Sequence, residues 1–153
     1  MEFFTGDSSV NQFILRDTTF LGQLDRLPDK IDDEYIGEFI GFSNATSSEY
    51  LLLVCENGGL NNQYNYFYLT DTIPTEYVNK MTVLRDSVFY TTLGVHIGSP
   101  EMDFRLKYKD VDFCIIQNAT DKIYEFQDTI SQYRSRYRFI NGCLSHIEFG
   151  YVW

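Results

Sequence analysis

Two histidines are the residues of this chain best suited by type to acid–base chemistry. His96 and His146 stand in similar settings, Val-His-Ile and Ser-His-Ile, and we predict both on strands. If those strands paired, the two imidazoles could form a general acid–base pair. Two separate strand histidines, each with its own hydrogen bonds, are the commoner arrangement. We therefore assign neither of them a catalytic role and expect no catalytic residue in the chain.

Paired carboxylates occur at Glu101 with Asp103 and at Asp110 with Asp112. Residues two apart on a strand share a face, so either pair could hold a divalent cation with water at the remaining sites. A metal-dependent hydrolase using these carboxylates is the enzyme reading of the pattern. The neighbouring Arg105 and Lys107 offer a simpler role as ion-pair partners. We expect no metal site and no cofactor, since no phosphate-binding glycine loop or zinc-ligand spacing occurs either.

These carboxylates fall in the stretch from Glu101 to Gln117, which we predict to be a hairpin that organises the sheet. Apolar residues alternate with charged ones up to Tyr108, as on a half-buried strand. A tight turn at Lys109-Asp110 would place Leu106 opposite Phe113 on the apolar face. The same turn would pair Lys107 with Asp112 on the other face. Cys114 and Ile116 are apolar residues on that other face, so we predict the second strand to be an inner strand that is covered on both sides.

A three-stranded meander is predicted before that hairpin. Its strands run from Ile36 to Phe42, from Tyr50 to Cys55 and from Gln63 to Leu69, and Asn57-Gly58-Gly59 supplies one turn. The middle strand is a continuous apolar run, which indicates burial on both faces. The last strand would place three exposed tyrosines on one face: Tyr64, Tyr66 and Tyr68.

Beyond Asn118, apolar residues recur at three- and four-residue steps to Tyr137, which predicts an amphipathic helix. Asn141-Gly142 conflicts with this prediction because it is a strong hairpin signal, and the arginines at 134, 136 and 138 alternate as on a strand. A two-residue turn there would place the arginine face on the side of Ile147 and Phe149. We therefore favour a helix capped by Gly142, followed by a last strand from Cys143 to Trp153.

The whole chain then has an α+β fold, mainly an antiparallel β-sheet with short N-terminal helices and one amphipathic helix near the C-terminus. The helices near the N-terminus would begin at Ser9 and at Thr18 or Thr19, with a strand over 11–16 as the alternative to the first. Residues 88–97 are predicted as a further strand. No linker or repeat divides the chain, so we expect residues 1–153 to form a single globular domain.

The formal charge of −10 disfavours nucleic-acid and anionic membrane partners and favours proteins with basic surfaces. No apolar run is long enough to span a membrane, and no secretory signal opens the sequence. The cysteines, Cys55, Cys114 and Cys143, are widely spaced among apolar residues, which indicates buried free thiols. A cytoplasmic location is the prediction from these features.

The densest acidic stretch, residues 25–38, is the candidate binding surface. Aromatic residues anchor interfaces, and Tyr35 lies among the carboxylates. The predicted contacts are Asp25, Asp29, Asp32, Asp33, Glu34 and Tyr35, with Tyr64, Tyr66 and Tyr68 as a second surface. We expect a non-catalytic binding module that masks a basic surface of a partner protein, as inhibitors, immunity proteins and anti-defence proteins do. A structural subunit of a virion or multiprotein machine is the alternative, and both are compatible with a homo-oligomer.

Overall fold

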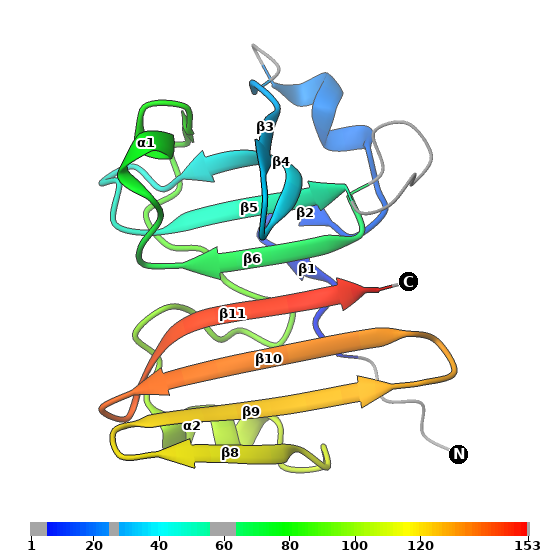
Figure 1. The fold of residues 1–153 in the computed structure, drawn as a ribbon, viewed down its shortest axis with the longest axis vertical. Coiled ribbons are helices and arrows are strands. Elements are labelled where there is room, and N and C mark those ends of the chain that lie inside the picture. Colours follow the sequence, from blue (N-terminus) through cyan, green and yellow to red (C-terminus); the bar gives the residue numbers. More distant parts are fainter. Residues whose placement is uncertain (1–5, 25–27, 56–63, 153) are drawn as a thin grey trace.

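A nine-stranded sheet forms the centre of the computed structural model, which describes residues 6–24, 28–55 and 64–152 (Figure 1). The strand order is β3-β4-β5-β6-β11-β10-β9-β8, with β7 paired in parallel to β4. Every other pairing in the sheet is antiparallel. The prediction of an α+β chain dominated by an antiparallel sheet is therefore confirmed. Among the described residues no α-helix is found near either end, and only a 3-10 helix begins at Thr19, one of the predicted starts.

The predicted meander is present as β4 (Gly37–Ser43), β5 (Tyr50–Cys55) and β6 (Tyr66–Thr70). The five residues from Tyr50 to Val54 are buried, as expected for a strand covered on both faces. The predicted Asn-Gly-Gly turn lies outside the described residues. β3 (Ile31–Asp33) pairs with the start of β4, and β7 (Thr82–Val83) pairs with its end.

Residues 121–140, which we predicted as an amphipathic helix, form β9 (Asp121–Asp128) and β10 (Tyr133–Ile140) instead. Ile130 belongs to the predicted apolar stripe but lies in the turn between these strands with 95% of its surface exposed. Tyr133 and Tyr137 are four residues apart, a spacing that suits one face of a strand as well as one face of a helix. The helix prediction is therefore wrong, and the apolar stripe that supported it is divided between the two faces of β9 and the turn after it.

Asn141 and Gly142 form the two-residue turn between β10 and β11 (Cys143–Tyr151), with φ values of 52° and 79°. Left-handed values at both positions are typical of a type I′ hairpin turn. The interpretation of Gly142 as a helix cap is wrong, and the last strand is confirmed over residues 143–151. A β-bulge follows the turn: Phe139 pairs with Leu144, but Arg138 pairs with His146, so Ser145 is the extra residue. Beyond the bulge Arg136 therefore lies opposite Glu148 instead of Ile147.

The predicted hairpin from Glu101 is also wrong in its first half, because residues 101–107 form α2 (Glu101–Lys107). Pro100 occupies its N-cap, acidic residues lie in the first turn and basic residues in the last, as the helix dipole favours. Phe104 and Tyr108 lie four residues apart and are buried, whereas Met102 and Leu106 are exposed. The second half of the prediction is confirmed only as a strand, β8 (Cys114–Asn118), which begins three residues later than predicted and pairs with β9. The prediction of an inner strand is wrong, because β8 lies at the end of the sheet and all five of its residues are exposed.

The N-terminal segment forms β1 (Ser9–Val10) and β2 (Phe13–Ile14), a small hairpin, and a 3-10 helix follows at Thr19–Gln23. The predicted helix from Ser9 is wrong because Asn11 adopts a left-handed φ of 49° at the hairpin turn. The predicted strand over 88–97 is also wrong. That segment is a loop that contacts β1 through a single bridge between Val10 and Thr91. A single helical turn after Pro74 forms α1 (Thr75–Val78).

The two faces of the sheet are covered differently. On the first face the β1–β2 hairpin, the 88–100 loop and α2 pack over a large core that runs from β4 to β9. On the second face a smaller core, which includes Tyr77 and Met81, covers β4, β5 and β6. Over β10 and β11 the second face carries charged residues.

Asp7 ties the N-terminal segment into the larger core. Its side chain is fully buried and accepts hydrogen bonds from the Tyr108 hydroxyl, the Tyr137 hydroxyl at 2.5 Å and the Leu93 amide at 2.9 Å. The Tyr133 hydroxyl donates to the Asp7 carbonyl at 2.7 Å. The carboxylate thus satisfies donors from three separate segments, which fixes the N-terminal segment against α2 and β10.

Two of the three cysteines do not fit the prediction of buried thiols. Cys114 and Cys143 are exposed and Cys55 is half-buried. Cys114 lies on the edge strand β8 and Cys143 lies beside the Asn141-Gly142 turn. The apolar residues that flank them are typical of any strand and do not indicate these exposed positions. Within residues 6–24, 28–55 and 64–152, no helix is long and apolar enough to cross a membrane.

Candidate functional site

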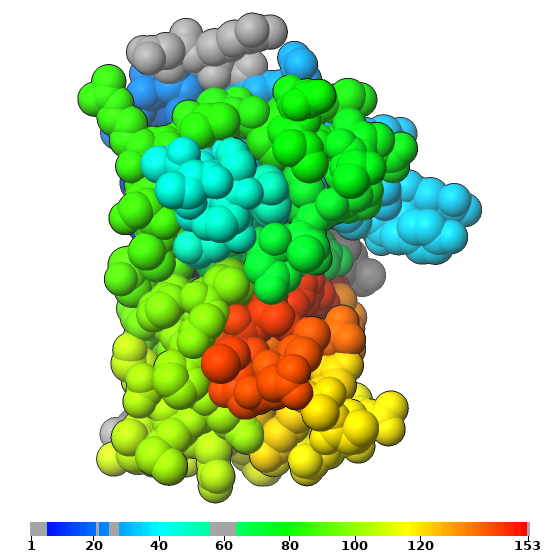
Figure 2. Space-filling model, turned by 90° about the vertical axis from the view of Figure 1, so that its left-hand side faces the viewer, coloured from blue at the N-terminus to red at the C-terminus, as the bar shows by residue number. Residues whose placement is uncertain are grey.

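The acidic stretch forms the hairpin of β3 and β4, and its turn projects from the body of the molecule (light blue, right side of Figure 2). Asp33 holds this turn in place. One of its oxygens accepts hydrogen bonds from the backbone N–H groups of Tyr35 at 2.8 Å and Ile36 at 2.9 Å, and the other accepts the Tyr77 hydroxyl at 2.6 Å. The hydrogen bond from Tyr77 is the main reason that the pKa of Asp33 lies below its usual range.

Tyr35 lies at the tip of this turn with 89% of its surface exposed. Asp32 and Glu34 are exposed at the turn and Asp29 is exposed just before β3, and none of the three has an ion-pair partner among the described residues. We call these four residues the acidic turn. The remaining predicted carboxylate, Asp25, lies outside the described residues.

Asp33 therefore differs from the other predicted contacts. Its carboxylate is committed to the turn and to Tyr77, and the same hydrogen bond raises the pKa of the Tyr77 hydroxyl to about 12. A side chain that already accepts three hydrogen bonds is suited to holding the turn more than to contacting a partner. The structure thus places three free carboxylates and one aromatic ring on one hairpin, whose turn a fourth carboxylate fixes.

The second predicted surface, Tyr64, Tyr66 and Tyr68, is wrong as an exposed tyrosine face. Tyr64 is 4% exposed and packs in the larger core against Phe20, while Tyr66 is fully buried in the core on the opposite face. Tyr68 is half-buried. Strand alternation predicted that the three tyrosines share one face of the sheet. The regular pairing of β6 begins only at Tyr66, so the side chain of Tyr64 need not follow the alternation of that strand.

A ladder of charged residues on the second face of β9, β10 and β11 was not predicted. Glu148, 6% exposed, is at its centre and lies 2.7 Å from His146 Nε2. Tyr66 donates to the same carboxylate at 3.0 Å, and Arg134 and Arg136 lie 3.8 and 3.7 Å away. Burial acts to raise the pKa of Glu148, but the hydrogen bond from His146 and the other donors outweigh it, so this pKa is lowered.

The outer members of the ladder are paired as well. Arg136 Nε lies 2.6 Å from Glu125, and Arg138 makes a bidentate pair with Asp121, with its shortest contact also at 2.6 Å. The only basic cluster of the sequence is therefore neutralised by neighbouring strands. The alternation of the three arginines was the available signal for this ladder, and the helix prediction concealed it.

A shallow cleft of about 330 Å³ adjoins the ladder where the covered and charged halves of the second face meet. Ile36, Tyr68 and Ile73 line one side, and Arg138 and His146 line the other. When His146 is neutral, its contact with Glu148 places the proton on Nε2 and leaves Nδ1 as an acceptor. This geometry suits a hydrogen-bonded strand histidine.

His96 lies in a different setting from His146. Its Nδ1 atom is 2.8 Å from the carbonyl oxygen of Ile97, and its ring packs edge-on against Tyr90 with centroids 5.3 Å apart. His96 also lies on the 88–100 loop instead of a strand. The two imidazoles thus have separate partners, as we favoured from the sequence.

The carboxylate pairs considered for metal binding do not share a strand. Glu101 and Asp103 lie on α2, where residues two apart point in different directions. Glu101 pairs with Lys122 at 3.2 Å and accepts the Tyr124 hydroxyl at 3.2 Å. Asp110 and Asp112 lie in the segment between α2 and β8. Among the described residues, no group of three histidine, cysteine or acidic side chains is arranged to hold a metal ion.

Comparison of the chain with protein-family models, with curated proteins and with solved structures gave no match.

Proposed function

We propose that this protein is a non-catalytic binding module whose acidic turn covers a basic surface of a partner protein. The observation that carries the proposal is Tyr35, an aromatic side chain 89% exposed at the tip of a turn that Asp33 holds in place. Aromatic side chains on fixed backbone lose little conformational entropy on binding and are enriched among the residues that dominate interface energies.

Charge supports the same function. Asp29, Asp32 and Glu34 lie on the same hairpin as Tyr35 and have no cationic partners in the part of the chain that the structure describes. The chain as a whole carries a formal charge of −10. Unpaired surface carboxylates cost little to bring against arginine and lysine, and the net field accelerates encounter with a basic surface. The partner is therefore a protein with a basic, concave or flat surface that accepts one tyrosine.

The experiment begins with affinity capture from the native host, using wild type and the Asp29→Asn, Asp32→Asn, Glu34→Gln triple variant as baits. A matched control variant, Asp71→Asn, Asp103→Asn, Asp110→Asn, removes the same charge at exposed carboxylates elsewhere. Asp33 is left unchanged in both because its loss would disturb the turn. The partner is the protein that wild type and control retain and the triple variant loses.

Binding kinetics with that partner then test the mechanism. We expect the triple variant to associate about tenfold more slowly than the control at low salt, with the difference fading as salt screens the charges. Tyr35→Ala should instead speed dissociation by about 30-fold, as the loss of an anchor worth about 2 kcal/mol would. Equal association rates for the triple variant and wild type at every salt concentration would show that the acidic turn is only a solvated surface.

A further inference from the structure

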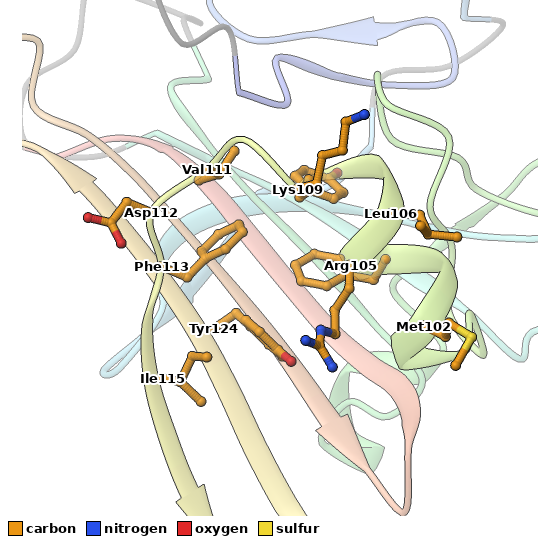
Figure 3. A pocket seen from close by; sticks show the side chains of 11 residues that line it. Met102, Arg105, Leu106, Lys109, Val111, Asp112, Phe113, Ile115 and Tyr124 are labelled. Carbon is orange, nitrogen blue, oxygen red and sulfur yellow. The ribbon is translucent and has the colours of Figure 1, made fainter.

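An apolar groove of about 480 Å³ lies on the first face of the sheet between α2 and the segment that leads into β8 (Figure 3). Phe113, Ile115 and Tyr124 line its sheet side, and Met102 and Leu106 line its helix side. Large apolar side chains are unusually exposed here: Met102 by 74%, Leu106 by 66% and Ile115 by 51%. Exposed apolar residues that gather around one groove mark a binding surface more than scattered ones do.

The strand that borders the groove is a free sheet edge. Among the residues that the structure describes, β8 pairs with β9 alone, and all five of its residues are exposed. Its sequence, Cys-Ile-Ile-Gln-Asn, contains no charge and no proline, the features with which proteins usually block an edge against further strands. At the opposite end of the sheet, β3 is only three residues long and carries Asp32 and Asp33. Of the two ends, β8 is therefore the one built to accept another strand.

The charges of the groove indicate which strand it accepts. Arg105 points into the groove and Lys109 stands at one end of it (Figure 3), and neither has a carboxylate partner in the described part of the chain. Other nearby cations are engaged, since Lys107 donates to the Gly94 carbonyl and Lys122 pairs with Glu101. Asp112 also lines the groove, but its side chain points away from Arg105. Two unpaired cations on a strongly acidic protein call for carboxylates from the ligand.

We propose that the β8 edge and this groove bind an extended segment of another protein, which pairs with β8 and places apolar and acidic side chains against α2. Side chains of adjacent strands on one face lie about 5 Å apart, so the added strand's residues would lie beside Ile115 at the groove. A second copy of this chain fits less well, because its own β8 brings no carboxylate to Arg105 and Lys109. The proposal does not rest on the acidic turn, which lies on the β3–β4 hairpin at the other end of the sheet.

The probe is a fluorescein-labelled, acetylated nonapeptide. Threonine occupies its odd positions, and valine and glutamate alternate at its even positions. A version with lysine in place of glutamate is the charge control. We expect saturable binding of the glutamate peptide, half-complete below about 1 mM, and at least tenfold weaker binding of the lysine peptide. Absence of saturable binding, or equal binding of the two peptides, would overturn the proposal.

Two protein variants locate the site. Arg105→Glu with Lys109→Glu should weaken binding of the glutamate peptide at least tenfold, because both cations become repulsive. The matched control, Lys80→Glu with Arg85→Glu, makes the same charge change at exposed residues beside β7 and should bind as wild type does. Circular dichroism confirms that both variants are folded. A loss of equal size in both variants would reduce the effect to net charge and refute the groove.

N-methylation separates strand pairing from apolar contact alone. On a strand, the N–H groups of alternate residues point to opposite sides. Methyl groups on all threonine nitrogens, or on all the other nitrogens, should therefore give one peptide that binds and one that does not. If both methylated peptides bind alike, no strand is added to β8. Sedimentation supplies the remaining outcome: a stable dimer that excludes the peptide would show that a second copy covers the edge, against the proposal.

Discussion

Replacing Asp7 with alanine tests how the N-terminal segment is held to the core. The variant leaves three buried donors without their acceptor: the hydroxyls of Tyr108 and Tyr137 and the amide of Leu93. At roughly 1 kcal/mol net for each hydrogen bond, we expect Asp7→Ala to lower the free energy of unfolding by about 3 kcal/mol. That is a large share of the 5–15 kcal/mol typical of a domain. Urea denaturation followed by far-UV circular dichroism measures it.

A second background makes the test specific to these hydrogen bonds. When Tyr108 and Tyr137 are both phenylalanine, only the Leu93 amide still needs the carboxylate, so Asp7→Ala should cost about 1 kcal/mol. The difference of about 2 kcal/mol between the two backgrounds is the energy of the hydroxyl contacts. If Asp7→Ala costs the same in both backgrounds, the hydroxyls contribute nothing and the reasoning is refuted.

The same contacts have an alkaline signature. Burial, followed by the charge of Asp7, raises the pKa of the Tyr137 hydroxyl, and the same two causes raise the pKa values of Tyr108 and Tyr133. A raised pKa in the folded state contributes stability that is complete below the unfolded value of about 10 and is lost as the pH rises above it. Absorbance at 295 nm should therefore show these tyrosines ionising together with alkaline unfolding and not before it.

Three further predictions concern the sheet and α2. Gly150→Ala should lower the free energy of unfolding by more than about 3 kcal/mol, because the φ of Gly150 is 148° and an added Cβ would lie 2.7 Å from Tyr66 Cα. Gly142 has open space around it, so Gly142→Ala should lower the free energy of unfolding by about 1 kcal/mol in the same urea assay. The pKa of Glu148 is lowered on folding, so its ionised carboxylate stabilises the folded state. The free energy of unfolding of wild type should therefore exceed that of Glu148→Gln by its full amount above a pH of about 5, and this excess should shrink as the pH falls below about 4. Phe104→Ala should lower the free energy of unfolding by about 3–5 kcal/mol and Leu106→Ala by less than about 1 kcal/mol, since the first side chain is fully buried and the second is 66% exposed.

The meander of β4, β5 and β6 could be predicted because its middle strand is a continuous apolar run that suits no other element of that length. The acidic turn could be located as a candidate surface from charge alone. Its geometry could not, since the role of Asp33 depends on the Tyr77 hydroxyl, 44 residues away in the chain. Contacts of that separation leave no periodic signal in the sequence.

The stretch from Glu101 to Tyr108 shows why period analysis failed at α2. Met102 with Leu106 and Phe104 with Tyr108 are each four residues apart, so the same residues satisfy the strand period and the helix period. The strand prediction grouped all four on one buried face, whereas the helix buries only Phe104 and Tyr108. Pro100 before the stretch, with acidic residues early and basic residues late, was the signal that separated the two.

The error at the C-terminal hairpin had one cause, Ser145. From the Asn141-Gly142 turn, regular pairing would place Arg136 opposite Ile147, which mixes charged and apolar residues on one face. The extra residue at Ser145 shifts the register by one and restores a charged face and an apolar face. The composition of this stretch does not reveal a bulge. The argument against the Asn141-Gly142 turn assumed regular pairing, so it did not include the extra residue and excluded the correct turn.

The pairing of β6 with β11 determines how this chain must fold. It joins the meander of β4–β6 to the meander of β8–β11 and brings together residues such as Tyr66 and Glu148, which are 82 positions apart in the chain. Each meander closes short loops and forms early, whereas closing the loop between them costs far more chain entropy. We therefore expect the pairing of β6 with β11 to be the slow step of folding.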